Sequence, residues 1–279
     1  MKVLVTGANG QLGHDVVKEL KLRNIEHYGA KRKDFDLCNF EQTDKFITAY
    51  KPDVVIHCAA YTAVDKAEEE KELCRVVNAG ATENIAKICK KIDAKMMYIS
   101  TDYIFDGEKD SYYEIDDVPN PINVYGQTKL EGEQKVQKIL DKYFIVRISW
   151  VFGDHGNNFV KTMLRLGKER KELSVVDDQI GSPTYTADLA PLLVDMIKTE
   201  KYGIYHATNE GECSWAKFAE EIFKAAGMDV KVNRITSAEY PTKAKRPKNS
   251  KMSKDSLVKY GFRALQTWQK SIIAFMEDK

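Results

Sequence analysis

Residues 5–13 read "VTGANGQLG" and carry three glycines at a spacing of three, Gly7, Gly10 and Gly13. The residues before them form a short apolar run typical of a strand, and the residues after them repeat apolar side chains with helical spacing. In a strand–turn–helix of this kind, the first glycine permits the tight turn and the second lets the backbone approach a pyrophosphate. The third lets helix and strand pack closely, while the helix N-terminus supplies N–H donors. The stretch predicts a dinucleotide-binding site, and the alternative is a glycine-rich turn without a ligand.

Apolar runs alternate with amphipathic helical patterns through the rest of the first half. Strands are expected at 2–7, 26–31, 53–60, 95–101 and 143–153, and helices at 11–24, 39–51, about 68–92 and 126–140. The third of these strands, "DVVIHCAA", is apolar almost throughout, as expected when helices cover both faces of a sheet. The alternation predicts an α/β fold with a Rossmann-type doubly wound parallel sheet.

After Gly153 the alternation becomes irregular. Helices are expected at 158–169, 186–199, 214–226 and 267–277, and short strands at 203–208 and 230–236. We interpret residues 1–154 as an NAD(P)-binding Rossmann domain and residues 155–279 as mainly a smaller, partly interleaved substrate-binding lobe. A segment at about 186–209 is expected to return to the Rossmann domain.

The composition excludes several classes of protein. Among 279 residues, 43 Lys and Arg against 42 Asp and Glu leave a net charge of +1, which argues against nucleic acid or an acidic membrane as partner. No apolar run approaches the ~20 residues that span a bilayer, and the start of the chain lacks the pattern of a signal peptide. The five cysteines are odd in number and scattered, which indicates free thiols in a reducing compartment. We expect a cytoplasmic protein.

The end of the second predicted strand bears on the choice of cofactor. Where many such proteins place an acid that binds the adenosine ribose, this chain has Ala30, Lys31 and Arg32. A carboxylate would repel a 2′-phosphate, whereas either cation can pair with one. The pattern favours NADPH as the cofactor, with NADH as the alternative. A different interpretation of Lys31 and Arg32 is that both are solvated surface charges without a ligand.

Tyr125 and Lys129 lie four residues apart in "NVYGQTKLEGEQKV", so they share one face of the predicted helix. They follow the fourth strand, whose end carries Thr101, and ligands bind at that edge of open α/β sheets. A tyrosine with an ordinary pKa of ~10 exchanges protons at neutral pH only if that pKa is lowered. We expect the Lys129 ammonium to lower the pKa of Tyr125, and Thr101 to hold a substrate carbonyl. The alternative is a solvated polar helix.

Together these stretches resemble the extended short-chain dehydrogenase/reductases. "TGANGQLG", "AAYTAVDKAE", "STDYIFDG", "YGQTKLEGE", "GSPTYTADLA" and "RPKNSKM" resemble one branch, the dTDP-4-dehydrorhamnose reductases, over essentially the whole chain. The resemblance implies reduction of the 4-keto group of dTDP-4-dehydro-L-rhamnose, with Tyr125 as proton donor. Lys129 would tune the phenol and hold the nicotinamide ribose, and Thr101 would contact the reacting oxygen.

The resemblance also implies two sets of binding residues. The cofactor set, with the two cations above, is Gly7, Gly10, Gln11, Leu12, Gly13, Lys31, Arg32, Asp36, Leu37, Ala59, Ala60, Tyr61, Tyr125 and Lys129. The sugar-nucleotide set is Thr62, Val64, Asp102, Tyr103, Trp150 and Arg246. The alternative for Trp150 is that it is an ordinary core residue. Arg246 is the candidate for binding the diphosphate, and the alternative is that it is an ordinary surface residue.

Other functions within the superfamily stay open at this stage. A nucleotide-sugar 4,6-dehydratase would carry Thr-Asp-Glu where this chain has Thr101, Asp102 and Tyr103, so its second carboxylate is missing. A 4-epimerase is an alternative, as is a non-catalytic binding subunit like the regulatory subunit of methionine adenosyltransferase. The resemblance allows a homodimer. Some relatives hold a metal at a dimer contact, but Asp15 is the only matching acid, and no metal is predicted.

Overall fold

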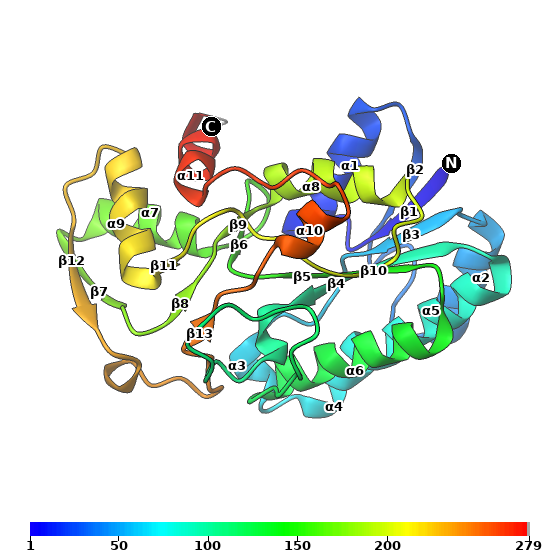
Figure 1. Ribbon diagram of the computed structural model, residues 1–279, viewed down its shortest axis with the longest axis horizontal. Coiled ribbons are helices and arrows are strands. Elements are labelled where there is room, and N and C mark those ends of the chain that lie inside the picture. Colours follow the sequence, from blue (N-terminus) through cyan, green and yellow to red (C-terminus); the bar gives the residue numbers. More distant parts are fainter. Residues whose placement is uncertain (278–279) are drawn as a thin grey trace.

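A computed structural model describes residues 1–277, which fold around a six-stranded parallel sheet (Figure 1). The strands run in the order β10-β5-β4-β3-β1-β2, and every neighbouring pair is parallel. Their bounds are β1 (Lys2–Thr6), β2 (Glu26–Ala30), β3 (Val54–His57), β4 (Lys95–Thr101), β5 (Tyr143–Ile148) and β10 (Gly203–His206). This sheet confirms the predicted Rossmann-type fold class.

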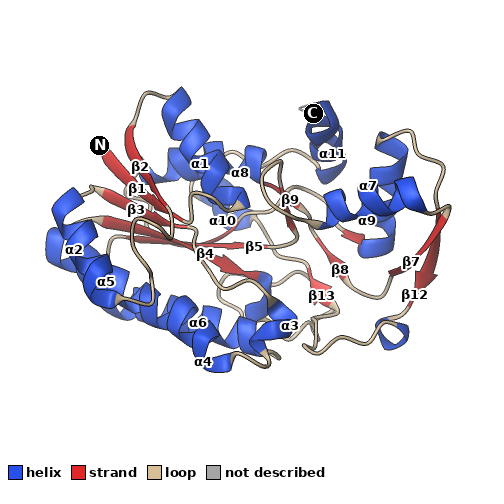
Figure 2. Ribbon diagram, turned by 180° about the vertical axis from the view of Figure 1, so that it is seen from behind, coloured by secondary structure: helices blue, strands red, loops and turns tan. Residues whose placement is uncertain are grey.

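Helices cover both faces of the sheet, as the apolar strands required (Figures 1 and 2). One face packs on α1 (Gln11–Leu22) and α8 (Thr186–Ile197), and the other on α2 (Phe40–Tyr50), α5 (Ala81–Ile92) and α6 (Val124–Ile139). The strand order reverses between β1 and β3, where one neighbour lies to each side of the first strand. Open α/β sheets bind ligands at such a switch point, beyond the carboxyl ends of the strands.

The helix expected at about 68–92 is correct in its body but wrong at its start. The chain forms a short α3 (Val64–Ala67), then α4 (Lys71–Arg75), a single π-helical turn at Val76–Gly80, and α5 without a break. The π turn presents Asn78, whose side chain accepts from the backbone N–H of Tyr61 at 2.8 Å and donates to its carbonyl at 3.2 Å. Such π turns recur at functional sites, and this one ties the helix to the loop after β3.

The strand expected over 143–153 is also wrong in part, because it divides at Trp150. This residue has a φ of +47°, in the left-handed region that an extended strand cannot contain. The chain resumes as β6 (Val151–Phe152), which pairs with β9 (Thr184–Tyr185) outside the main sheet. The break turns the chain toward the second lobe.

The second lobe lies beside the carboxyl edge of the sheet (Figure 1). Its helices α7 (Phe159–Glu169), α9 (Trp215–Ala225) and α11 (Trp268–Glu277) confirm the expected ones, as does β12 (Lys231–Ile235). The patterns missed several short elements: β7 (Glu172–Val176), β8 (Ile180–Gly181), β11 (Cys213–Ser214), β13 (Asn249–Ser250), α10 (Asp255–Lys259), and the 3₁₀ turns η2 (Asp102–Ile104) and η3 (Ser237–Glu239). Phe152, Phe218 and Phe275 belong to the core of this lobe.

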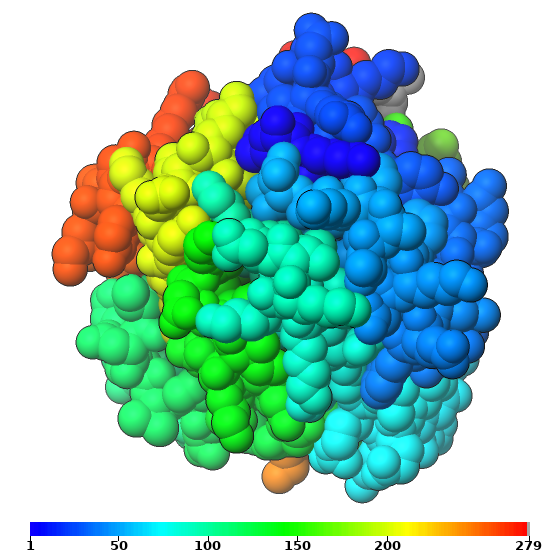
Figure 3. All heavy atoms as spheres, turned by 90° about the vertical axis from the view of Figure 1, so that its right-hand side faces the viewer, coloured from blue at the N-terminus to red at the C-terminus, as the bar shows by residue number. Residues whose placement is uncertain are grey.

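One segment from the second half lies with the first. Helix α8 packs beside α1, and β10 extends the main sheet next to β5. Figure 3 looks onto this end of the molecule, where the yellow atoms near residue 200 lie beside the N-terminal half. Within residues 1–277, no helix has the length and apolar character needed to cross a membrane.

Candidate active site

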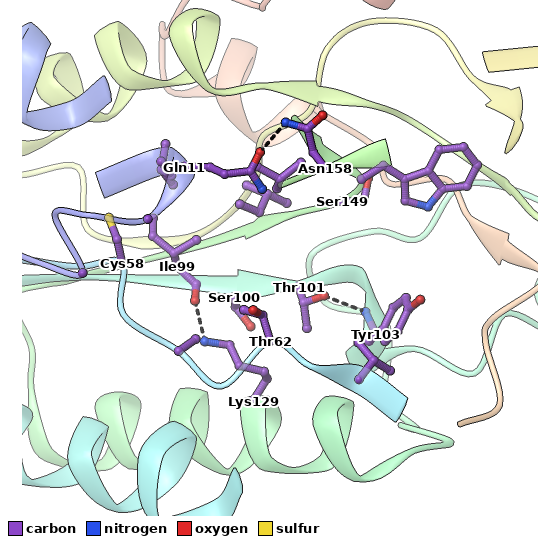
Figure 4. Close-up of a pocket in the computed structure, with 18 of the residues that line it drawn as sticks. Gln11, Cys58, Thr62, Ile99, Ser100, Thr101, Tyr103, Lys129, Ser149 and Asn158 are labelled. Carbon is purple, nitrogen blue, oxygen red and sulfur yellow. Dashed lines mark hydrogen bonds between the residues drawn. The ribbon is translucent and has the colours of Figure 1, made fainter. Parts of the chain in front are cut away.

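A cavity of about 690 Å³ lies at the carboxyl edge of the sheet and is lined from both lobes. Its volume is within the range of small-molecule sites. The glycine turn, the loop after β3, the ends of β4 and β5, helix α6 and the second lobe all contribute to its wall. Figure 4 shows part of this wall, with Gln11 on one side and Lys129 on the other.

The glycine turn has the geometry that a dinucleotide requires. Gly7 has a φ of +67°, and a Cβ there would lie 2.8 Å from the backbone of Ala59. A Cβ on Gly13 would lie 2.3 Å from the carbonyl oxygen of Gly7, so helix and turn pack without room for a side chain. Gly10 caps α1, and no side chain in the described part of the chain accepts from the first turn of this helix. Those N–H groups are available to an anion in the cavity, so the residues present fit a pyrophosphate.

A second cavity of about 320 Å³ adjoins the first and shares Gly7, Asn9, Ala59 and Ala60 with it. It is lined by the residues predicted for the adenosine end of the cofactor, namely Lys31, Arg32, Asp36, Leu37 and Tyr61. Arg32 is 86% exposed and lies 3.8 Å from the Asp36 carboxylate. Both cations therefore stand at the rim, where a 2′-phosphate could reach them.

Tyr125 and Lys129 both line the larger cavity from the first turns of α6. This helix begins there because the side chain of Asn123 accepts the backbone N–H of Gly126 at 2.8 Å. Lys129 is buried, and its Nζ donates to the carbonyl oxygen of Ile99 at 2.7 Å (Figure 4). Burial lowers the pKa of Lys129 to about 7, with the Glu133 charge opposing the change.

The expected tuning of the tyrosine by the lysine is not met in this structure. Burial raises the pKa of Tyr125 above its ordinary value, and a hydrogen bond with the Thr101 hydroxyl opposes that rise. The Lys129 ammonium is turned toward Ile99 on β4 and is not among the groups that shift the phenol. Tyr125 is therefore protonated at neutral pH, which is the form that donates a proton.

Two buried polar atoms in this cavity have no hydrogen-bond partner among the described residues, the Oγ of Ser100 and the Oδ2 of Asp102. The other carboxylate oxygen of Asp102 accepts from the Thr101 hydroxyl at 3.0 Å. Burial raises the pKa of Asp102 to about 6, against hydrogen bonds from Ser250 and Thr101. Buried polar atoms without a partner are costly, and the Oγ of Ser100 is the clearer case because Ser250 also interacts with the Asp102 carboxylate.

The predicted sugar-nucleotide residues gather on the same wall, with one exception. Thr62, Val64, Asp102, Tyr103 and Trp150 all line the larger cavity. Arg246 lies outside that lining and donates to Asp65 at 2.7 Å. It also interacts with Tyr103, which does line the cavity. Of all predicted site residues, only Arg246 and Gly13 line neither cavity, since Gly13 packs beneath the turn.

The structure adds cavity residues that the patterns did not indicate. Trp215 comes from the start of α9, and Asn158 caps α7 and donates to the Oε1 of Gln11 at 2.9 Å (Figure 4). Ser149 and Gly156 belong to the same wall. No local signal marks Trp215, whereas Asn158 is recognisable as a helix cap. Its contact with the glycine turn depends on how the lobes pack.

Comparison with known proteins identifies close relatives. Residues 1–279 match the family described as the RmlD substrate binding domain. The chain is 43% identical over 264 residues to the dTDP-4-dehydrorhamnose reductase of Aggregatibacter actinomycetemcomitans, covering 89% of each chain. It is 37% identical over 292 residues to that of Escherichia coli K12, covering 100% of this chain and 98% of the relative. A crystal structure of a dTDP-4-dehydrorhamnose reductase from Bacillus anthracis, in complex with NADP, superposes with a TM-score of 0.97 at 45% identity and 100% coverage of both chains.

Proposed function

The chain belongs to the dTDP-4-dehydrorhamnose reductase family of the extended short-chain dehydrogenase/reductases, and on this premise we propose that it reduces the 4-keto group of a dTDP-4-keto-6-deoxy sugar with NADPH. The proposed substrate is dTDP-4-dehydro-L-rhamnose and the product dTDP-L-rhamnose. The observation that carries the proposal is one cavity that joins the glycine turn to Thr101, Tyr125 and Lys129.

The roles of these residues follow from their positions. When bound, the dihydronicotinamide supplies the hydride. Tyr125 holds its proton at neutral pH because burial raises its pKa, and it gives that proton to the carbonyl oxygen as negative charge develops there. The Thr101 hydroxyl, at the end of β4, holds the same oxygen beside the phenol by turning its proton from Asp102 to the substrate. Lys129 uses one N–H on Ile99 and keeps the others for the nicotinamide ribose.

The residue beside Tyr125 favours a reductase over a dehydratase. The ring of Tyr103 packs edge-on against Tyr125, with centroids 5.7 Å apart. Burial raises the pKa of Tyr103 and the neighbouring Asp102 raises it further, so this side chain does not supply the base that water loss needs. A 4-epimerase remains the second enzymatic candidate, and a non-catalytic binding subunit the third.

The remaining assignments complete the proposal. Residues 1–154, joined by about 186–209, form the cofactor-binding domain, and the rest of 155–279 forms most of the substrate-binding lobe. Arg246 binds the diphosphate of the sugar nucleotide, with Asp65 holding its guanidinium in place. We propose that the protein is cytoplasmic, and the resemblance allows a homodimer.

The deciding experiment is NADPH oxidation against a panel of dTDP-4-keto-6-deoxy sugars, with the product identified by NMR. Turnover of the 4-keto sugar to one dTDP-6-deoxyhexose supports the reductase. An NADPH-independent change of configuration would establish an epimerase, and absence of both reactions would leave only the binding subunit. Tyr240→Phe is the matched control for Tyr125→Phe, because Tyr240 is 61% exposed and lines neither cavity.

A further inference from the structure

Trp150 has an unusual backbone for a large aromatic residue. Its φ of +47° lies in the left-handed region, which costs free energy for any residue with a Cβ. Such conformations persist where contacts with neighbouring residues stabilise them, and they are frequent at ligand-binding sites. Trp150 also lines the cavity, so its surroundings define how its indole meets a ligand.

Two residues of the second lobe hold that indole in place. Trp215 stacks on it with ring centroids 3.7 Å apart and planes 12° from parallel. Gly181 lies so close that a Cβ there would approach the indole Cε2 to 2.7 Å, so only glycine fits. These two contacts restrict the orientation of the Trp150 indole.

Trp215 is itself fixed by hydrogen bonds. Its Nε1 donates to the Oε1 of Gln179 at 3.2 Å, and Gln179 donates onward to the Ser237 hydroxyl at 2.9 Å. Phe159 packs against the same indole, with centroids 4.6 Å apart. A residue held from three sides can act as a rigid support for its stacking partner.

The register of the sheet brings Trp150 close to Thr101, the residue proposed to hold the substrate carbonyl. Ile148 on β5 is paired with Thr101 on β4, and Trp150 follows Ile148 by two residues. The chain turns out of the sheet at Trp150, and Trp150 lines the same cavity as Thr101 and Tyr125. Since these two residues hold the sugar carbonyl in the proposed function, the part of Trp150 open to the cavity faces the deoxyhexose.

We propose that Trp215 is a substrate-positioning residue, which holds Trp150 as the surface on which the deoxyhexose ring packs. This inference rests on the proposed function. Trp215 acts through Trp150 and leaves the cofactor and the proton donor untouched. The second lobe thereby contributes an apolar support to recognition of the sugar.

The stack has a spectroscopic signature in solution. The chain has three tryptophans, and Trp268 is buried in the second lobe. Two indoles in contact couple their transitions, and they give a paired positive and negative band in far-ultraviolet circular dichroism when one ring is rotated relative to the other about the stacking axis. That paired band should vanish in Trp150→Phe and in Trp215→Phe, and persist in Trp268→Phe.

Steady-state kinetics then test the role. Trp215→Ala should raise the KM for the 4-keto sugar nucleotide roughly 3- to 10-fold, the size of one aromatic contact, with the KM for NADPH and kcat nearly unchanged. Trp215→Phe keeps a stacking ring and should restore most of the wild-type KM. In a Trp150→Ala background, Trp215→Ala should have no further effect on that KM.

The matched control is Trp268→Phe, which perturbs the same lobe away from the cavity and should lower the melting temperature without changing the KM. A Trp215→Ala enzyme that loses stability but keeps the wild-type KM would overturn the proposal, as would additive effects of the two alanines. Failure of the proposed function is distinguishable, because the wild-type protein would then not turn over the 4-keto sugar at all.

Discussion

The Nζ of Lys129 donates a hydrogen bond of 2.7 Å to the carbonyl oxygen of Ile99. The ammonium also lies 4.0 Å from the centroid of the Tyr98 ring, inside the fold rather than in solvent. This position keeps the charge away from the Tyr125 phenol and lowers the pKa of the lysine to about 7 through burial. Because burial disfavours the charged form, a ligand that contacts the ammonium also stabilises that form.

The first prediction concerns proton transfer. Tyr125→Phe keeps the ring and its packing but removes the transferable proton, so kcat should fall roughly 10²- to 10⁴-fold. NADP⁺ affinity, measured by calorimetry, should change little. The Tyr240→Phe enzyme serves as control and should match wild type. A folded Tyr125→Phe protein with wild-type kcat would end the proposed mechanism.

The second prediction concerns stability and pH. The pKa of Lys129 falls from 10.5 to about 7 on folding, so the unfolded chain binds more protons between these values. The free energy of unfolding therefore rises with pH between about 7 and 10.5. Below about pH 7 the lysine is charged in both states, and the cost of burying its charge is fully present. Without cofactor, Lys129→Met should melt at a higher temperature than wild type below pH 7, although it should bind NADPH more weakly.

Thermal melts at several pH values between about 6 and 10 should show this difference shrinking as pH rises. Lys138→Met on the same helix is the control, because Lys138 is exposed and should show no such trend. A constant difference across the whole range would contradict the pKa assigned to Lys129.

The third prediction concerns cofactor preference. Lys31 and Arg32 line the adenosine-side cavity, so NADPH should bind at least as tightly as NADH. Replacing both by Ala should weaken NADPH roughly tenfold or more, since hydrogen bonds to charged groups are lost, and leave NADH nearly unchanged. Lys33→Ala provides the control, because Lys33 is exposed and lies outside that lining. A preference for NADH that survives the double substitution would refute the inference from these cations.

The fourth prediction concerns reaction type. Because Tyr103 stands where a dehydratase needs a carboxylate, incubation with dTDP-glucose and NAD⁺ should yield no 4-keto-6-deoxy product. Mass spectrometry of the sugar nucleotide would detect loss of water directly. Appearance of that product would overturn the reductase assignment.

The fifth prediction concerns Arg246. If its guanidinium binds the diphosphate, Arg246→Ala should raise the KM for the sugar nucleotide roughly tenfold, the effect of one charge-assisted hydrogen bond. Asp65→Asn removes the charge of its partner but keeps the arginine, and should have a smaller effect. Equal effects from the two variants would indicate that the pair only fastens the segment around Arg246 to α3.

The sequence by itself predicted the sheet, the glycine turn and the proposed catalytic trio, because each depends on local spacing. Apolar runs that alternate with helical patterns predict βαβ units, and this prediction does not depend on contacts with distant segments of the chain. Gly7, Gly10 and Gly13 are close in sequence, and Tyr125 and Lys129 share a helix face by geometry alone. Thr101 was identified from its place at the end of a strand.

Only the tertiary structure decided how distant segments meet. Trp150 and Trp215 are 65 positions apart, and their stacking follows from packing of the two lobes rather than from any period in the sequence. The direction of the Lys129 side chain, the break in the strand at Trp150 and the ion pair of Arg246 with Asp65 likewise depend on neighbours brought in from other elements. Local patterns record the backbone that a segment prefers, whereas the contacts of a side chain depend on which surfaces the whole fold brings together.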